Sequence, residues 1–417
     1  MKRGIFVSFA LIVITIISWV FSSPDTNYTQ IYLVSHLIGA FSLVGFALNF
    51  FISTRHQILD EFWHGLDKAY VAHKWIGISS VGLAICHIVM LQMARQMEIL
   101  PPLLAPPEGD VQPGFFSIIL FLILVITALV AKRMKFEVWK TIHKFLLLPY
   151  AIGVLHYYAV SVFSFTSPFG IWMNIINIIG IASAIYSIFL YGRLAFKFKY
   201  KVISVSHVAK KTLEITGKAV NKHLTYKPGQ FTFMKINKGK SKFSPHPFTL
   251  SSAPQSDTVQ LTIKGIGDHT AKLMNTIRVD DEFVLTKPHG KFDVSAGGKN
   301  QIWIAGGIGV TPFRSFCQAG IPKDFSVDFF YSYNGEEGAY VEELQKYAKN
   351  ILRIHLIDST TQGYLTIDKI EEMANIQNPV DVYFCGPKPM RNSFRKGFKN
   401  SKIRVQGFHF EEFGFGR

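Results

Sequence analysis

The chain has 417 residues, of which 49% are hydrophobic and 17% are charged, and its formal net charge is +16. This length predicts two or three domains. The excess of basic residues does not predict a nucleic acid partner, because it includes clusters at the ends of apolar segments, where the positive-inside rule places them. The three cysteines, Cys86, Cys317 and Cys385, form neither a CxxC nor a CxxCH motif. Their spacing excludes a disulfide framework and covalent c-type haem.

The first part of the chain contains apolar segments that are long enough to cross the hydrocarbon core of a membrane, which is about 30 Å thick. The N-terminal segment is longer than the apolar core of a signal peptide, and no small-x-small cleavage site follows it. It is therefore expected to be retained as a span. The six predicted spans are residues 4–21, 31–53, 69–93, 114–131, 142–162 and 170–191.

Basic residues lie at the ends of these spans that belong to one side, while the opposite loops contain a single one, Arg95. By the positive-inside rule, and with an even number of spans, both termini and the C-terminal half of the chain are expected in the cytoplasm. The sequence therefore predicts a multi-pass protein of the plasma membrane, with the lipid bilayer as its first partner.

Two of the predicted spans carry paired histidines. On an ideal helix, His73 and His87 would lie ~21 Å apart along the axis and ~40° apart around it. His143 and His156 repeat the arrangement in the span 142–162, and the two pairs match in depth. Imidazole is a good iron ligand. Two such helices facing each other predict two stacked b-type haems, each with an axial histidine on both sides of the iron.

The second histidine pair is harder to place on one helix face. An ideal helix would leave His143 and His156 ~140° apart around the axis, so we expect the helix to be distorted, and Pro149 lies between them. A single histidine in a span is as readily explained by a hydrogen bond to a neighbouring helix. Two pairs at matched depth favour metal binding, because ionisable residues inside a membrane are usually functional.

The pattern changes after the apolar part. From Phe196 the sequence shows short alternating segments separated by turn residues, which predict an antiparallel β-barrel. From Gln301, strands alternate with helical segments that begin near Thr311, Val341, Thr366 and Pro387, as in a doubly wound α/β domain. The predicted domains are a six-helix transmembrane haem bundle over 1–195, the barrel over 196–297 and a Rossmann-like nucleotide domain over 298–417.

Two segments of the predicted barrel suit a flavin. HPFTLSSAP (246–254) follows one strand and precedes another, and Thr249 could supply a donor near the flavin N5. KGIGDHTAKL (264–273) begins a predicted helix, whose N-terminal N–H groups would bind the pyrophosphate, with positive charge from Lys264 and His246. Each segment alone is an ordinary turn. The candidate flavin residues are His246, Pro247, Phe248, Thr249, Lys264, Gly267, Asp268, His269 and Thr270.

Two segments of the α/β domain suit a nicotinamide nucleotide. IWIAGGIGVTPF (302–313) predicts a strand, a glycine turn and a helix, although it is not a GxGxxG motif. DVYFCGPKPM (381–390) ends another strand beside the same crevice, where Cys385 would lie close to the nicotinamide or simply be a small buried residue. The candidate nucleotide residues here are Gly306, Gly307, Gly309, Thr311, Pro312, Cys385, Gly386 and Pro387.

HPFT, GGIGVTPF, CGP and the ending HFEEFGFGR together resemble the ferredoxin-NADP reductase superfamily. With six spans and the histidine spacings, the whole chain resembles the NADPH oxidase and ferric reductase family, above all its small bacterial members. The resemblance implies FAD, two b haems, NADPH or NADH as donor, and electron flow through FAD and both haems to an external acceptor. It also implies that Phe413 covers the flavin ring and yields to nicotinamide, rather than being a core aromatic.

The sequence departs from this family at two places. Members that select the 2′-phosphate of NADPH tend to have an arginine after the second nucleotide strand, where this chain offers Ser332 and Asn334, followed by Glu336 and Glu337. NADH use is therefore plausible. Oxidases of the family often have an arginine near the outer haem, and that level is here occupied by His36. This histidine would donate a hydrogen bond to oxygen or to a haem propionate, or be an interfacial residue without a role.

The leading hypothesis is a superoxide-producing NAD(P)H oxidase, because the short outer loops lack a histidine or carboxylate cluster for iron. A ferric-chelate reductase with the same electron path is the alternative. A haem anchor that serves a partner protein would not need the flavin and nucleotide half. There is no EF-hand loop and no long proline-rich tail. We therefore expect activity without calcium or an obligate cytosolic activator.

Overall fold

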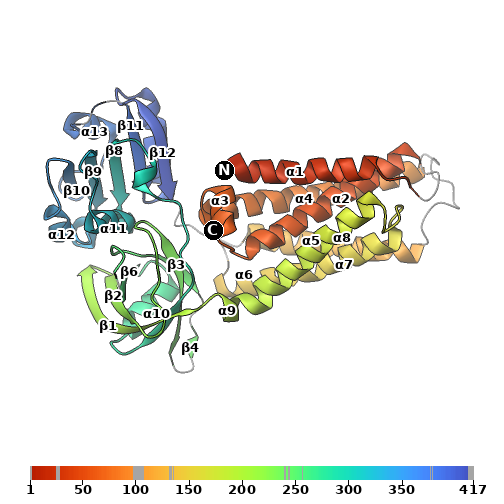
Figure 1. Cartoon of the computed structure of the whole chain (residues 1–417), viewed down its shortest axis with the longest axis horizontal. Helices are drawn as coiled ribbons and strands as arrows, with labels where there is room; N and C mark the ends of the chain where they lie inside the picture. The colour runs from red at the N-terminus through yellow and green to blue at the C-terminus, as the bar shows by residue number, and fades with distance from the viewer. Residues whose placement is uncertain are drawn as a thin grey trace. The chain divides into compact units, whose positions relative to one another are not determined.

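The computed structural model describes residues 2–24, 29–96, 108–130, 134, 136–238, 241–242, 245–255, 257–375, 377 and 379–411. The chain divides into two compact units between Leu194 and Ala195. The first unit is helical and the second is built on two β-sheets (Figure 1).

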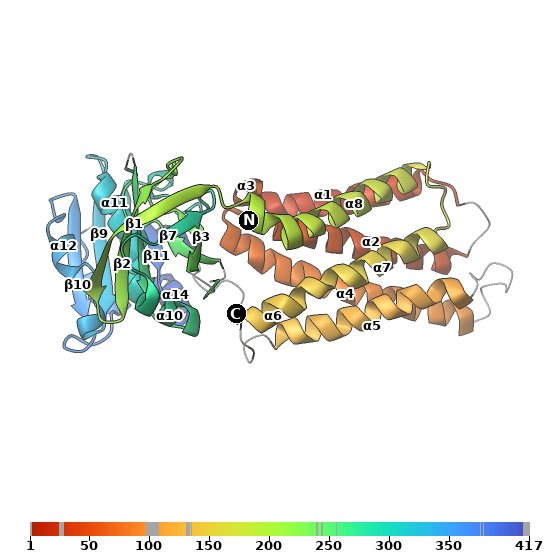
Figure 2. The same ribbon diagram turned by 90° about the horizontal axis from the view of Figure 1, so that it is seen from below.

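Helices that lie alongside one another form the N-terminal unit (Figures 1 and 2). They are α1 (Lys2–Val20), α2 (Gln30–Ser53), α3 (Ile58–Trp63), α4 (Leu66–Gln96), α5 (Glu108–Leu129), α6 (Phe136–His143), α7 (Leu147–Val160), α8 (Pro168–Ile185) and α9 (Tyr191–Leu194). A π-helical turn at Tyr186–Leu190 joins α8 to α9. Among the described residues, five helices are long and apolar enough to cross a membrane: Arg3–Val20, Gln30–Ser53, Leu66–Ala94, Gln112–Leu129 and Pro168–Leu194.

The predicted span 142–162 is not one continuous α-helix. Its first residues belong to α6, a 3₁₀ turn covers Lys144–Leu146, and α7 has 14 residues. Pro149 explains the change, because it has no N–H for the carbonyl one turn earlier and its ring crowds that carbonyl. The carbonyl of Pro149 itself accepts a hydrogen bond of 2.8 Å from the Ser117 hydroxyl of α5. The distortion expected between the two histidines is therefore present.

Helix α2 packs closely against α4 and α5. The rings of Phe46 and Phe121 stack with centroids 4.0 Å apart, and the Ser42 hydroxyl donates a 2.8 Å hydrogen bond to the Ser80 carbonyl. A β-carbon at Gly45 would overlap the Ser80 side chain. Small residues that allow backbones to approach in this way are typical of helix contacts inside membranes.

An antiparallel sheet forms the first part of the second unit. Its strands are β1 (Phe198–Ala209), β2 (Thr212–Ala219), β3 (Phe231–Lys238), β4 (Ser241–Lys242), β5 (His246–Thr249), β6 (Thr258–Lys264) and β7 (Glu282–Leu285). The seven strands follow the order β4-β3-β7-β1-β2-β6, and β5 pairs with β3. An isolated bridge between Leu250 and Leu261 brings the chain after β5 beside β6. HPFT, expected between two strands, thus forms a strand of its own.

A parallel sheet forms the rest of the unit. Its strands are β8 (Asn300–Gly306), β9 (Ser326–Tyr333), β10 (Leu352–Asp358), β11 (Val380–Cys385) and β12 (Val405–Glu411). Helices α11 (Thr311–Ala319), α12 (Val341–Gln345), α13 (Ile367–Met373) and α14 (Lys388–Gly397) begin at or next to the predicted positions. The order β10-β9-β8-β11-β12 reverses direction between β8 and β11. In open parallel sheets, ligands bind beyond the carboxyl ends of the strands at such a switch point.

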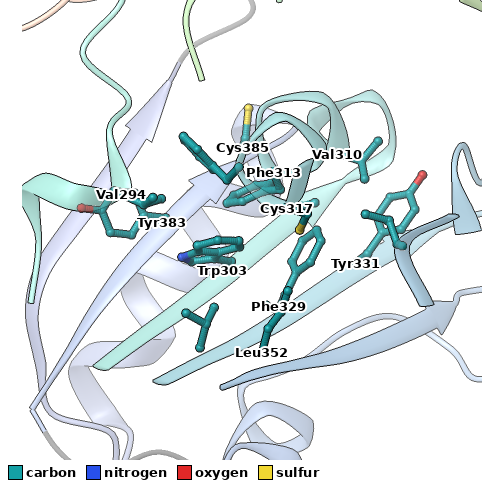
Figure 3. Packing of buried hydrophobic residues seen from close by; sticks show 14 of the residues in the cluster. Val294, Trp303, Val310, Phe313, Cys317, Phe329, Tyr331, Leu352, Tyr383 and Cys385 are labelled. Atoms are coloured by element: carbon teal, nitrogen blue, oxygen red, sulfur yellow. The ribbon is translucent and has the colours of Figure 1, made fainter. Parts of the chain in front are cut away.

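Aromatic residues pack against β8 and its neighbour β9, beside the switch point. The Phe313 ring of α11 lies 5.6 Å from the Trp303 ring of β8 and 5.0 Å from the Phe329 ring of β9, centroid to centroid. Cys385, at the end of β11, is fully buried in the same cluster (Figure 3). Dense packing of this kind leaves little freedom to the loops that follow β8 and β11.

Candidate active site

The two histidines of the predicted inner level face each other. The rings of His73 on α4 and His143 at the end of α6 have centroids 6.1 Å apart and planes at 62°. Nδ1 of His73 lies 3.2 Å from the carbonyl oxygen of Asn49 in α2. An Nδ1–H that donates to this carbonyl leaves Nε2 as the metal-binding nitrogen, which is how metal-binding histidines are usually oriented. Nδ1 of His143 is buried without a hydrogen-bond partner in the described part of the chain.

Three histidines gather at the level that the sequence predicts to be the outer one. Nδ1 of His87 lies 2.8 Å from the carbonyl oxygen of Ser35, so its Nε2 is also available. The ring in edge contact with His87 is that of His36, with centroids 5.9 Å apart. His156 is near enough to interact electrostatically with both. The predicted ligand His156 thus belongs to the same cluster as His87. The sequence placed His36 only at this depth, whereas its ring contacts that of His87.

His36 is held by two backbone carbonyls. Its Nδ1 lies 3.1 Å from the Tyr32 oxygen and its Nε2 lies 3.3 Å from the Val160 oxygen. A neutral imidazole can donate to only one of them. Both contacts are therefore hydrogen bonds only if the ring is the imidazolium, and a neutral ring makes one of them.

Two glycines complete the outer histidine cluster. A β-carbon on Gly114 would lie 2.7 Å from Nε2 of His156, and one on Gly39 would lie 3.1 Å from Nδ1 of His87. Sequence reasoning did not select these glycines or the carbonyls of Ser35 and Asn49. A backbone carbonyl carries no sequence signal, and a glycine in a span shows only that something approaches closely.

This donor set fits haem. Histidine side chains hold b-type haem through one ring nitrogen, and a hydrogen bond at the other nitrogen fixes the orientation of the ring. His73 and His87 both make that bond, on one helix, to carbonyls of α2. Among the described residues, there is no group of three or more His, Cys, Asp or Glu side chains that could hold a metal ion by themselves.

Thr249 is the residue of the HPFT strand that suits a flavin best. Its side chain is 5% exposed, and its Oγ1 has no hydrogen-bond partner within the described residues. A buried hydroxyl without a partner costs free energy, so a ligand atom is a natural partner. Phe248 and Thr249 are buried, while His246 and Pro247 are half-buried at the start of the strand.

The second flavin segment lies next to HPFT. The rings of His246 and His269 stack with centroids 3.6 Å apart, which brings β5 and the first turn of α10 (Asp268–Thr276) together. Gly267 is the N-cap of this helix, and the Thr270 hydroxyl accepts a 3.2 Å hydrogen bond from its N–H. The helix N-terminus therefore suits a phosphate, as predicted for FAD.

Lys264 has a protein partner that the sequence did not indicate. Its Nζ forms a 2.7 Å ion pair with Glu337, which follows β9 in the nucleotide domain. The hydrogen bond from Lys264 lowers the pKa of the Glu337 carboxyl. A β-carbon at Gly307 would lie 3.9 Å from the same Nζ. Lys264 thus stands between the two sheets of the unit, at the rim of the switch point.

The predicted nucleotide turns come together at the carboxyl edge of the parallel sheet. Ala305 of β8 pairs with Cys385 of β11, and a β-carbon on Gly309 would overlap the Cys385 carbonyl oxygen. Gly307 has φ of 53°, in the left-handed region that glycine tolerates. Thr311 and Pro312 begin α11, and Gly386 and Pro387 lead into α14. The Cys385 thiol belongs to the buried core, so the backbone forms the edge.

The residues after β9 lie at the same edge. Ser332 pairs with Gly306, and Asn334 precedes the turn that carries Glu336 and Glu337. Glu336 forms a 2.9 Å ion pair with Lys210 of the antiparallel sheet. An acidic side chain at this position suits the ribose 2′-hydroxyl of NADH. Phe413 lies outside the described residues.

Comparisons with known proteins agree with this organisation. Residues 38–154 match the family described as ferric reductase like transmembrane component, 197–301 match an FAD-binding domain, and 303–396 match an oxidoreductase NAD-binding domain. The class is therefore an oxidoreductase in which flavin- and nucleotide-binding domains follow a membrane domain. The chain thus has the domain architecture of the NADPH oxidase and ferric reductase family, with a dehydrogenase half of the ferredoxin-NADP reductase type.

Curated relatives match the dehydrogenase half. Flavohemoprotein A of Dictyostelium discoideum is 25% identical over 213 residues, covering 46% of this chain and 53% of its own length. The carnitine monooxygenase reductase subunit of Escherichia coli is 25% identical over 189 residues, covering 44% of this chain and 58% of its own. The chain thus spans about half the length of the curated relatives it matches.

Solved structures resemble the same half. The flavohem-like FAD/NAD binding domain of nitric oxide dioxygenase from Vibrio cholerae is 18% identical, with a TM-score of 0.43, and the match covers 52% of this chain and all (100%) of that one. A ferredoxin NADP+ reductase from Neisseria gonorrhoeae is 17% identical, with a TM-score of 0.44, over 51% of this chain and 98% of that one.

Proposed function

We propose that this protein is a transmembrane NAD(P)H oxidase that moves electrons from cytoplasmic NAD(P)H, through FAD and two b-type haems, to O₂ on the other side of the membrane, where superoxide forms. The observation that carries the proposal is the inner histidine pair. His73 and His143 come from different helices and face each other with centroids 6.1 Å apart. In the same apolar unit, His87 and His156 belong to a second cluster fourteen and thirteen residues further along.

Each residue set has a separate task. When bound, FAD and haem would supply the redox chemistry, a hydride acceptor and carriers of single electrons. Thr249 would donate a hydrogen bond to the flavin, and the N–H groups that begin α10 would bind its pyrophosphate. The turns at Gly307 and Gly386 approach the nicotinamide nucleotide closely. The imidazoles of His73, His87, His143 and His156 hold two metal centres at two depths, which shortens each electron hop.

Four histidines holding two haems would leave no position at the iron for a substrate. The acceptor would therefore be reduced without binding iron, near His87, where His36 is a polar side chain in ring contact. In this proposal His36 donates a hydrogen bond to the reduced acceptor or to a propionate.

A ferric-chelate reductase is the second candidate. The match of residues 38–154 to a ferric reductase like component favours it. A chelate needs no built iron site, and the electron path inside the protein would be the same. The proposed orientation, with the dehydrogenase half in the cytoplasm and many spans in the plasma membrane of a bacterium, applies to both.

The first test is spectroscopic. Purified protein loaded with haem should show a reduced-minus-oxidised spectrum of low-spin b-type haem, and its absence would contradict the proposed path. The second test compares superoxide dismutase-sensitive cytochrome c reduction with reduction of an Fe(III) chelate, using NADH and NADPH in turn. Faster chelate reduction that superoxide dismutase does not affect would favour the reductase. The acidic turn after β9 predicts the higher kcat/KM for NADH.

A further inference from the structure

A buried charged network joins the antiparallel sheet to the nucleotide domain. Arg314 of α11 has a side chain that is 5% exposed and contacts carboxylates from both parts. Its Nη1 donates at 2.8 Å to Glu214 of β2, and its Nε donates at 2.8 Å to Glu343 of α12. The guanidinium carbon also lies 4.1 Å from the centroid of the Tyr340 ring.

Tyr340 forms a second link between the nucleotide domain and the antiparallel sheet. Its hydroxyl donates at 2.7 Å to Glu214 and lies 2.6 Å from the Thr262 hydroxyl of β6. This tyrosine has φ of 62°, in the left-handed region that non-glycine residues rarely adopt. Strained backbone persists where surrounding contacts over-determine it. The contacts that do so here come from the opposite domain.

The network touches both candidate cofactor segments. Nη1 of Arg314 also donates at 3.2 Å to the carbonyl of Ser251, which is two residues beyond Thr249. The next residue, Ser315, donates at 2.7 Å from its hydroxyl to the Ser252 carbonyl. Arg314 is itself three residues beyond Thr311, where α11 begins after the glycine turn. The segment directly after the strand with the candidate flavin donor is thus hydrogen-bonded to the helix that follows the nucleotide turn.

The chemistry of the network makes it rigid. Burial alone would lower the pKa of the Arg314 guanidinium, but hydrogen bonds to Glu343 and the charges of Glu214 and Glu343 outweigh it, so the pKa is raised. The guanidinium therefore stays charged. An arginine presents its donors in a planar fork, which fixes the angle between its partners as well as their distance. Removing one member would leave a buried charge without compensation.

We propose that Arg314 is a positioning residue that locks the flavin-binding and nucleotide-binding parts in one orientation, so that nicotinamide bound at the glycine turn meets a flavin beside Thr249 without domain movement. This inference rests on the proposed function. Productive transfer requires close alignment, and a displacement of about 1 Å can cost on the order of 100-fold in rate. The lock acts on alignment, not on binding of either cofactor.

The test uses the full chain, purified with FAD, and measures flavin reduction by NADH in a stopped-flow instrument. Arg314→Lys keeps the charge but loses the fork, and it should lower the limiting rate of flavin reduction by about 10- to 100-fold. The NADH dissociation constant and the FAD content should change little. Tyr340→Phe keeps the ring and removes one buried hydrogen bond, so it should lower the same rate by about 3- to 10-fold.

The matched control is Arg353→Lys. Arg353 forms a comparable fork with the buried Asp328, at 2.9 and 3.0 Å, but both residues belong to the nucleotide domain. This variant should keep the wild-type rate of flavin reduction. The proposal is overturned if Arg314→Lys keeps that rate, if Arg353→Lys loses it equally, or if both network variants fail to retain FAD. If the wild-type protein does not reduce its flavin with NADH or NADPH, the proposed function itself fails.

Discussion

Gly309 packs directly against the backbone of Cys385, so closely that a β-carbon on the glycine would overlap the cysteine carbonyl oxygen. The two residues are 76 positions apart in the sequence, and they meet because β8 and β11 are neighbours in the parallel sheet. The contact defines the edge at which the nucleotide is expected to bind.

Gly309→Ala should therefore impair the use of the nucleotide more than the binding of FAD. The clash is with backbone and cannot be relieved by a side-chain rotation, so we expect a loss of about 1–3 kcal/mol in stability. We also expect a large rise in KM for NADH, measured by dye reduction. Gly82→Ala is the control, because nothing lies within 4 Å of a β-carbon at that position in α4. Wild-type KM in Gly309→Ala would contradict the placement of the nucleotide.

Thr249→Val should have opposite effects with and without FAD. In protein stripped of FAD, valine removes a buried hydroxyl that has no partner among the described residues, so the melting temperature should stay the same or rise. With FAD bound, we expect flavin reduction to slow about 3- to 10-fold, the equivalent of one hydrogen bond. Calorimetry and stopped-flow absorbance measure the two effects.

Thr232→Val provides the contrast to Thr249→Val. The Thr232 hydroxyl donates at 3.0 Å to the Thr286 carbonyl, so its loss should cost about 1–3 kcal/mol in the stripped protein. Equal destabilisation by both substitutions would show that the Thr249 hydroxyl has a hydrogen-bond partner within the protein and needs no ligand to supply one.

His87→Leu should separate the two halves of the proposed path. Leucine cannot bind iron, so roughly half of the b-type haem absorbance should be lost with one of the two centres. Dye reduction by NADH should continue at the wild-type rate, because the flavin and nucleotide residues belong to a different unit of the chain. The exposed His207→Leu variant controls for loss of an imidazole. Loss of dye reduction in His87→Leu would contradict the modular division.

Acid should weaken the nucleotide domain through Asp328. Burial alone would raise the pKa of this carboxyl, but hydrogen bonds from His355 and Arg353 outweigh burial, so the pKa lies below its ordinary value. A lowered pKa contributes stability above the unfolded pKa of about 3.9, and this contribution is lost as the pH falls through the folded value. Calorimetry of Asp328→Asn should show a lower melting temperature at neutral pH and a weaker dependence on pH below about 4.

A stable Asp328→Asn protein with the wild-type acid dependence would contradict this assignment. The comparison is made at constant ionic strength. A change in salt would alter the screening of exposed ion pairs such as Lys210–Glu336 and would so change the measured pH dependence.

Local patterns were enough to predict much of this protein. The matched depth of the histidine pairs predicted that His73 and His143 share one level, and their rings lie 6.1 Å apart. Alternation with turn residues located most strands to within a few positions. The glycine turn and the CGP segment were assigned to one crevice, and the structure brings them to one sheet edge. These features depend on the order of residues within one segment, where the period of a helix or strand decides which side chains share a face.

Tertiary structure decided what lies between segments. The sequence did not indicate the ion pair between Lys264 and Glu337. The sequence did not decide between two roles for His36, and the fold places its ring in contact with that of His87. Arg314 carried no sequence signal, although it bonds both sheets of its unit. Each outcome depends on a partner distant in the chain, and only packing determines which charges and rings are buried against one another.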